Sequence, residues 1–262
     1  MEVLATCHVH SEWSYDARWT LDALAAKFND RGSRVLLMTE HDRGFTPARL
    51  AQYRAACAKA SSDKVLVVPG IEYSDAANRV HVLVWGPVPF LGEDLPTGEM
   101  LERVEAAGGL AVLAHPSRRD VWKSFQPDWE RRLLGIECWN RKYDGWAPSR
   151  TAPELLARAG AVSFVGLDFH TDRQTFPLVM ALDLAKDHEV SEAAVLDCLR
   201  NRRCAARAFG VPLAETLVRT ATPLLTVAEK GRRMLASAVR SARNRAARPK
   251  RSGAAAEPPV AR

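Results

Sequence analysis

The chain contains seven histidines, and five of them lie at the ends of apolar segments. His8 and His10 are one residue apart, and Asp168 and His170 repeat that spacing farther along the chain. Residues i and i+2 of a β-strand point to the same side, so each pair would present two ligand atoms together. Imidazole and carboxylate in combination favour divalent ions such as Zn, Fe and Mn. The spacing therefore predicts a metal site.

Other metal-ligating side chains follow the same pattern. His41 follows residues 34–39, Glu72 follows 65–71 and His115 closes 110–114. His81 lies inside the apolar segment 80–86, where an unpaired imidazole would be costly to bury, and Asp16 lies in a loop. One ion takes about four protein ligands, so a set of nine exceeds the need of a single ion. We therefore expect more than one metal ion, with a carboxylate such as Glu72 shared between two.

Apolar runs alternate with helical segments over the first 210 residues. The expected strands are 3–9, 34–39, 65–71, 80–86, 110–114, 134–139, 161–167 and 204–209. The expected helices are 21–29, 47–60, 98–107, 153–159 and 191–202. Thr20 is a helix-start signal, and Thr151 with Glu154 forms a capping-box pattern. The alternation predicts an α/β protein with a parallel sheet, open or closed into a barrel, whose strand ends carry the ligands.

The ligand-type residues also occur in a recognisable order. The blocks are His8-x-His10, Asp16, Thr39-Glu40-His41, Glu72, His81, His115-Pro116 and Asp168-x-His170. This order resembles the PHP (polymerase and histidinol phosphatase) superfamily over residues 1–210. The resemblance implies a distorted barrel of seven strand–helix units, PHP-type, and hydrolysis of a phosphoester by two or three Mn, Fe or Zn ions.

The resemblance also implies how the ligands divide. His8, His10, Glu72 and Asp168 would hold one ion, Glu72, His81 and His115 a second, and Asp16, His41 and His170 a third. Catalytic roles would fall to His41, Glu72, His115, Asp168 and His170. The family often has histidine where this chain has Asp16, and an oxygen ligand there favours Mn or Fe over Zn. Glu40 replaces the usual aspartate, which leaves the role of that carboxylate open between support of the site and a solvated loop position.

A phosphate also needs positive charge. Arg118 is the first candidate, because a guanidinium can bind phosphate through two hydrogen bonds. Arg43, Arg141 and Lys142 are further candidates, with ordinary loop cations as the alternative. Trp139, Tyr143 and Trp146 could stack on a base or sugar, or could pack into a loop that shields the site.

The net charge of +6 is unevenly divided. Residues 211–262 hold 11 Lys and Arg against 3 Asp and Glu, whereas residues 1–210 hold 26 against 28. The basic character therefore belongs to a tail, and the body at 1–210 is nearly neutral. Apolar positions 224, 228, 235, 239 and 242 recur at helical spacing among arginines, which indicates a basic amphipathic helix. Such a helix could contact an anionic membrane or nucleic acid, and the alternative is a solubilising extension. Residues 248–262 are expected to be disordered, and His188 is expected at the surface.

The five cysteines are scattered and odd in number, which favours reduced thiols in a cytoplasmic protein, peripheral to a membrane if the tail binds one. No apolar run is long enough for a bilayer span, and no secretory signal is expected. The expected substrate is a small phosphomonoester or a nucleotide-like phosphoester, with nucleic acid as an open partner. The alternatives are a non-catalytic metal-binding module that acts as an adaptor through the tail, and hydrolysis of a C–N bond.

Overall fold

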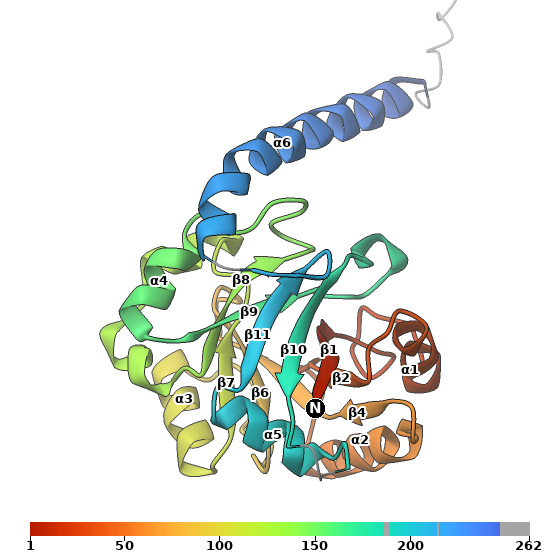
Figure 1. Ribbon diagram of the computed structural model, residues 1–262, viewed down its shortest axis with the longest axis vertical. Coiled ribbons are helices and arrows are strands. Elements are labelled where there is room, and N and C mark those ends of the chain that lie inside the picture. Colours follow the sequence, from red (N-terminus) through yellow and green to blue (C-terminus); the bar gives the residue numbers. More distant parts are fainter. Residues whose placement is uncertain (186–188, 214, 247–262) are drawn as a thin grey trace, which may run out of the picture.

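The computed structural model describes residues 1–185, 189–213 and 215–246, and the side chains of the C-terminal helix over 222–239. The expectations for His188 and for residues 248–262 lie outside the described residues. Two six-stranded sheets form the centre (Figure 1). The first has the order β12 (Val211–Pro212), β11 (Cys204–Ala208), β10 (Leu178–Asp183), β1 (Glu2–Val9), β2 (Val35–Met38), β4 (Leu66–Val68). The second has the order β3 (Glu40–His41), β5 (Gly70–Ser74), β6 (His81–Trp85), β7 (Leu110–Leu113), β8 (Gly135–Asn140), β9 (Val162–Gly166).

Backbone hydrogen bonds join the two sheets beyond the end of β9. Leu167 donates its N–H to the carbonyl of Cys7 at 3.0 Å, and Phe169 donates to that of His8 at 3.0 Å. His10 in turn donates to the carbonyl of Phe169 at 3.0 Å. The two sequence pairs that suggested a metal site, at 8–10 and 168–170, therefore lie side by side although 160 residues separate them.

The sheets are mixed, not parallel as the sequence suggested. β5, β6 and β7 are antiparallel neighbours, and β10 pairs antiparallel with both β1 and β11. The short connection between β5 and β6 has no room for the crossover that parallel neighbours require. Strand β10 was not expected. The structure thus retains the α/β class but does not have seven regular strand–helix units.

The helices that cover the outer faces are α1 (Leu21–Asn29), α2 (Pro47–Ala60), α3 (Thr97–Ala106), α4 (Ala152–Ala159) and α5 (Glu192–Arg200), and α6 (Glu215–Ala246) follows them. The 3-10 segments are η1 (Arg118–Ser124), η2 (Pro127–Arg132) and η3 (Asp172–Gln174). Thr20 caps α1 as expected, accepting from the N–H of Ala23 at 3.2 Å. The capping box predicted for α4 at Thr151 and Glu154 is wrong. Thr151 has helical backbone angles and its side chain makes no capping bond, while the hydroxyl of Ser149 accepts from the N–H of Ala152 at 3.3 Å.

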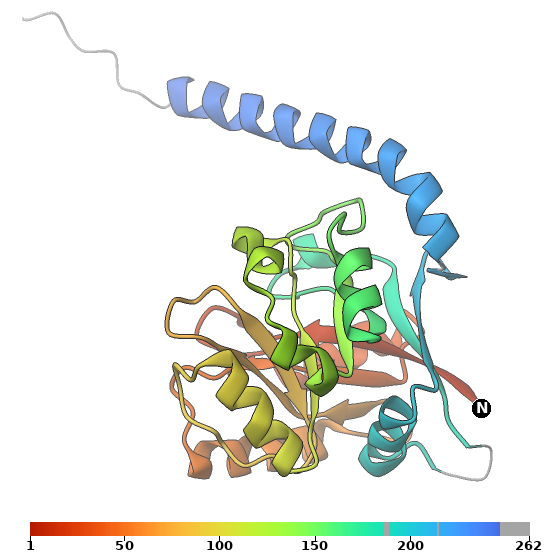
Figure 2. The same cartoon turned by 90° about the vertical axis from the view of Figure 1, so that its left-hand side faces the viewer.

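Strand β2 illustrates why the apolar runs are strands, since all four of its side chains are fully buried. A strand covered on both faces needs apolar residues at every position. Helix α6 is different, because most of it stands clear of the body (Figure 2). Within the described residues, none of the helices combines the length and apolar character that a membrane crossing requires.

Candidate metal centre

Glu72 is the centre of the histidine cluster. Its Oε2 lies 3.4 Å from Nε2 of His8, 3.3 Å from Nε2 of His10 and 3.2 Å from Nδ1 of His41. Its Oε1 lies 2.6 Å from Nδ1 of His81 and 3.1 Å from Nε2 of His115. Two ligands on a tetrahedral ion with bonds of about 2.05 Å are about 3.3 Å apart. The carboxylate thus directs one oxygen toward each of two groups of imidazoles, as a bridging ligand would.

A third group lies at the solvent side of the cluster. Oδ1 of Asp16 lies 3.4 Å from Nε2 of His41, and Oδ2 of Asp16 lies 3.1 Å from Nε2 of His170. The two imidazole nitrogens are 3.5 Å apart. Asp16 is the most exposed of the candidate ligands, with 36% of its side chain accessible. The structure therefore brings all nine predicted ligands into one cluster. Ligand atoms lie within 4.8 Å of one another in three overlapping sets: His10, His41 and His170; His8, Glu72 and His115; and His8, His10 and Asp168.

Asp168 lies between His8 and His10 on one side and Lys142 on the other. Its Oδ1 is 3.8 Å from Nε2 of His8 and 3.7 Å from Nε2 of His10. Lys142 approaches the same oxygen, with Nζ at 2.9 Å. This places Lys142, one of the four predicted phosphate-binding cations, directly beside the cluster.

Three of the candidate ligands have backbone angles that L-residues rarely adopt. The φ angles are 59° at His8, 28° at His115 and 49° at Asp168. At His8 the register between β1 and β2 shifts, so the strand bulges there. Left-handed backbone at non-glycine residues costs free energy, and such strain gathers at functional sites.

The chemistry of this donor set fits divalent ions. Burial, reinforced by His41 and His170, holds the pKa of His10 well below its usual range, and burial also lowers the pKa of His115. Both imidazoles are then neutral and offer a lone pair. Within the described part of the chain, Nε2 of His8, Nε2 of His10 and Oε2 of Glu72 are buried without a hydrogen-bond partner. Such atoms are costly to bury unless a cation binds them.

The carboxylates need that cation as well. Burial by itself would raise the pKa of Glu72, but the imidazoles of His8 and His81 hold it well below its usual range. Burial likewise opposes ionisation of Asp168, whose pKa is lowered by His8 and Lys142. Two ionised carboxylates thus lie close together. The positive charges beside them are Lys142 and the ring of His8, whose pKa Glu137 and Glu72 raise well above its usual range although burial opposes this.

Glu137 completes the site, and it was missed from the sequence. Its Oε1 lies 2.9 Å from Nδ1 of His8, and its Oε2 accepts the N–H of His115 at 2.8 Å and the amide of Asn140 at 2.8 Å. Glu137 is 1% exposed. The available signal was a carboxylate in the middle of an otherwise apolar strand, where it must have buried partners.

Glu40 also supports the site, and it is not a solvated loop residue. It is fully buried and accepts hydrogen bonds from the N–H and hydroxyl of Ser11 and from the hydroxyl of Ser14. The Ser14 hydroxyl lies 3.3 Å from Nδ1 of His10. Glu40 and Ser14 together fix the position of the His10 ring.

The other predicted phosphate-binding cations lie farther from the cluster. Arg118 donates to the carbonyl of Asn78 at 2.7 Å and to its side-chain oxygen at 3.1 Å, and this oxygen lies 2.6 Å from Nε2 of His81. Arg118 therefore supports His81 through Asn78, a residue the sequence did not single out. Arg43 is exposed beside a small cavity that His41 and His81 also line. Arg141 packs over the Phe176 ring at 4.9 Å.

The three aromatic candidates have different positions. Trp139 is 2% exposed and donates its ring N–H to the carbonyl of Gly145, so it has no open face for stacking. Tyr143 packs against the ring of His115, with centroids 4.6 Å apart, and its hydroxyl accepts from Arg118. Trp146 is 41% exposed beneath the guanidinium of Arg232. Only Tyr143 contacts a predicted ligand.

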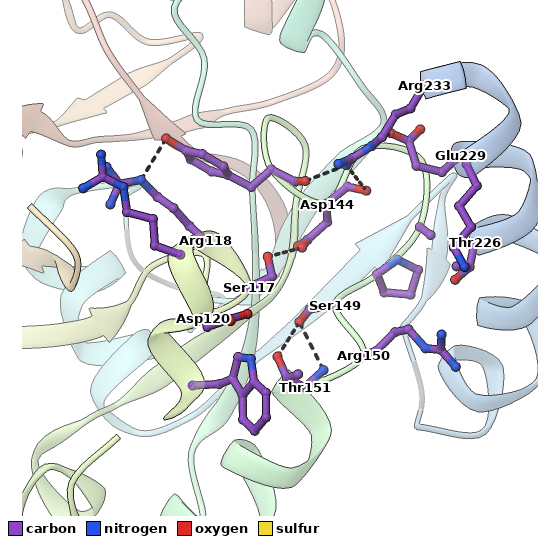
Figure 3. A pocket seen from close by; sticks show the side chains of 16 residues that line it. Ser117, Arg118, Asp120, Asp144, Ser149, Arg150, Thr151, Thr226, Glu229 and Arg233 are labelled. Atoms are coloured by element: carbon purple, nitrogen blue, oxygen red, sulfur yellow. Dashed lines mark hydrogen bonds and ion pairs between the residues drawn. The ribbon is translucent and has the colours of Figure 1, made fainter. Parts of the chain in front are cut away.

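A cavity of about 720 Å³ lies between α6 and the loop 141–151 that follows β8. Figure 3 shows Glu229 and Arg233 of α6 on one wall, and Ser117 and Arg118 on the opposite wall. Arg118 and Tyr143 line the cavity and also border the metal cluster. The cavity therefore adjoins the cluster through these two side chains.

Comparison with solved structures identifies the architecture. A two-domain protein from Bacteroides vulgatus that contains a predicted PHP-like metal-dependent phosphoesterase matches with a TM-score of 0.62 and 16% identity, over 83% of this chain and 68% of that one. This chain has the PHP fold. PsfC from Pseudomonas syringae also matches, with a TM-score of 0.58 and 16% identity over 89% of this chain and 98% of that one.

A third matching structure is the lesion-specific endonuclease PfuEndoQ from Pyrococcus furiosus. The TM-score is 0.52 and the identity 17%, over 75% of this chain and 56% of that one. This chain thus spans little more than half of the length of that endonuclease. No protein-family model matches the sequence, and none of the curated proteins is significantly similar to it.

Proposed function

We propose that this protein is a metal-dependent phosphoesterase. The observation that carries the proposal is Glu72, whose two oxygens face two separate groups of imidazoles at distances suited to shared metal coordination. His8, His10, Glu72 and Asp168 would hold one ion, Glu72, His81 and His115 a second, and Asp16, His41 and His170 a third. Mn, Fe and Zn are the candidates. When bound, such ions activate water as a nucleophile and neutralise phosphoryl oxygens.

The chain's own residues orient the reaction. Glu137 and Glu40 with Ser14 hold the rings of His8 and His10, so ligand positions are fixed before substrate arrives. Lys142, 2.9 Å from Asp168, carries an ammonium that can donate to a phosphoryl oxygen. The pKa of Lys142 is raised by Asp168 although burial opposes this, so the lysine stays charged. Of the predicted catalytic residues, Glu72, His115, Asp168 and His170 are buried, and His41 is partly exposed.

The test measures metal content and hydrolysis together. Purified protein should contain at least one Mn, Fe or Zn per chain and should hydrolyse members of a phosphoester panel in Mn, Fe, Zn or Mg. His115→Ala and Asp168→Ala should reduce the rate by about 100-fold or more. His188→Ala is the matched control, because the sequence places this histidine outside every motif. If the purified protein contains no metal and remains inactive after addition of each ion, the proposal of a metal-dependent phosphoesterase is wrong.

The substrate is either a small phosphomonoester or a nucleotide-like phosphoester, including nucleic acid. The likeness to an endonuclease and the cavity with Arg118 and Tyr143 beside the cluster favour the second class. Tyr143→Ala should then slow hydrolysis of a nucleotide substrate much more than that of an aryl phosphate. Equal effects on both would favour the small phosphomonoester.

Two other functions have distinct signatures in the same experiments. A non-catalytic adaptor would bind metal and hydrolyse no member of the panel, while His115→Ala would unfold it. A C–N hydrolase would act on cyclic amides included in the panel. A cytoplasmic location remains a proposal that accords with the five free thiols.

A further inference from the structure

The outward face of α6 carries a row of exposed apolar side chains. Leu224, Val227, Met234, Leu235 and Val239 are between 52% and 77% exposed. At about 100° per residue these positions fall within an arc of about 140° on the helix surface. From 224 to 239 the row extends over about 24 Å. A surface this apolar is unusual for side chains that face water.

The opposite face of α6 is attached to the body. The carboxylate of Glu229 accepts from the N–H of Trp146 at 3.2 Å and forms ion pairs with Arg232 and Arg233. Arg233 also donates to the carbonyl of Tyr143 at 2.7 Å. Glu229 is 5% exposed, so this contact is closed to water. Because one face is fixed, the apolar row is held on the side that points away from the body, where Figures 1 and 2 show open space around most of the helix.

Positive charge accompanies the apolar row. Lys230 and Arg232 border the arc on its two sides. Residues 211–262 together carry 11 Lys and Arg against 3 Asp and Glu. An apolar helix face flanked by cations, with acidic residues scarce, complements a bilayer that exposes anionic headgroups over hydrocarbon.

The other occupants fit this face less well. A coiled coil with a second copy would place Gly231 and Ala238 at every second core position of the heptad that begins at Leu224, and these small side chains leave the seam unfilled. Nucleic acid would bind cations but would leave the apolar row in water. We therefore propose that the outward face of α6 docks the protein on an anionic lipid bilayer. The cavity lies against the inward face of α6, so docking would hold the cavity near the membrane surface.

The test is co-sedimentation of the full chain with vesicles. Equal parts of phosphatidylglycerol and phosphatidylcholine are compared with phosphatidylcholine alone. We expect binding to the anionic vesicles about tenfold or more stronger than to the neutral ones, and weaker at high salt. The quadruple variant Leu224→Gln, Val227→Gln, Met234→Gln, Leu235→Gln should lose about tenfold or more of this binding. Glutamine is a good helix former, so circular dichroism should stay unchanged.

A matched pair of single variants controls for general loss of apolar surface. Val227→Gln, on α6, should weaken vesicle binding, and Val211→Gln, which is 48% exposed on β12, should not. Absent or equal binding to both vesicle types would overturn the proposal, as would full binding by the quadruple variant. A dimer that this variant converts to monomer, without vesicle binding, would assign the face to a second copy. None of these outcomes bears on hydrolysis at the metal centre.

Discussion

Nδ1 of His8 lies 2.9 Å from Oε1 of Glu137, and both side chains are almost completely buried. The other oxygen of Glu137 accepts the N–H of His115 and the amide of Asn140. One carboxylate therefore orients a predicted ligand of the first metal group and anchors the backbone at a ligand of the second. A carboxylate that accepts a hydrogen bond from the N–H of a ligating imidazole fixes the tautomer of that imidazole and raises its basicity.

Glu137→Gln should lower metal affinity by about 10- to 100-fold. The three groups around this carboxylate are all donors, and glutamine offers a single acceptor oxygen, so at least one donor loses its partner. Metal affinity would be measured by competition with a chelating dye. Glu105→Gln, which changes a glutamate in an exposed ion pair with Arg132, is the control and should have no effect. Unchanged affinity in Glu137→Gln would show that the carboxylate does not support the metal.

Removal of metal should destabilise the protein. Nε2 of His8, Nε2 of His10 and Oε2 of Glu72 would be left buried without partners, and a ligand that binds only the folded state contributes to its stability. Calorimetry with and without a chelator should show a lower melting temperature in the chelated sample, and Mn or Zn should restore it. A melting temperature insensitive to both chelator and metal would contradict the ligand assignment.

The sequence predicted well which residues gather in the cluster, and it predicted poorly which residues support them. His8, His10, His41, His115 and His170 follow apolar runs, and local pattern was sufficient to find them. Glu137 acts through partners that are distant in the sequence, because His8 lies 129 residues and His115 22 residues before it. No local spacing encodes such pairs.

The same distinction applies to the fold. Helices α1 and α2 begin and end where composition and capping residues predicted. Strand direction was not predictable in this way, because a buried strand has the same apolar composition whether its neighbours are parallel or antiparallel. Strand β10 lies between β1 and β11 and pairs with both, which local sequence does not reveal.

Gly145→Ala should detach α6 from the body. A Cβ atom at Gly145 would lie 2.2 Å from Oε1 of Glu229, and the backbone there has a φ of 78°. Gly210→Ala is a matched control, because Gly210 has the same φ of 78° with no atom within 4 Å of its Cβ position. Both variants incur the cost of left-handed backbone, about 1 kcal/mol, and only Gly145→Ala displaces the carboxylate of Glu229.

Hydrogen exchange of the α6 amides distinguishes the two glycine variants. Exchange should become faster in Gly145→Ala and should remain as in the wild type in Gly210→Ala. Glu229→Gln should act in the same direction as Gly145→Ala, because the N–H of Trp146 would lose the charged acceptor that joins it to α6. Equal protection of α6 in all variants would mean that the Glu229 contact does not hold the helix.

Asp144 should make stability fall as the pH rises. Burial raises its pKa to about 7, although the hydroxyl of Ser117 and the N–H of Asn140 donate to its oxygens. Between about pH 4 and pH 7 the folded carboxyl keeps a proton that the unfolded chain has lost, so folding becomes less favourable over that range and levels off above it. Asp144→Asn tests this prediction, because it resembles the protonated form and keeps an acceptor for the N–H of Asn140.

The free energy of unfolding of Asp144→Asn relative to the wild type should increase by on the order of 3 kcal/mol between pH 4 and pH 8. Urea unfolding of metal-loaded protein at both pH values measures this gain, with Asp63→Asn, at an exposed aspartate, as the control. Parallel stability curves for Asp144→Asn and the wild type would show that Asp144 is ionised throughout.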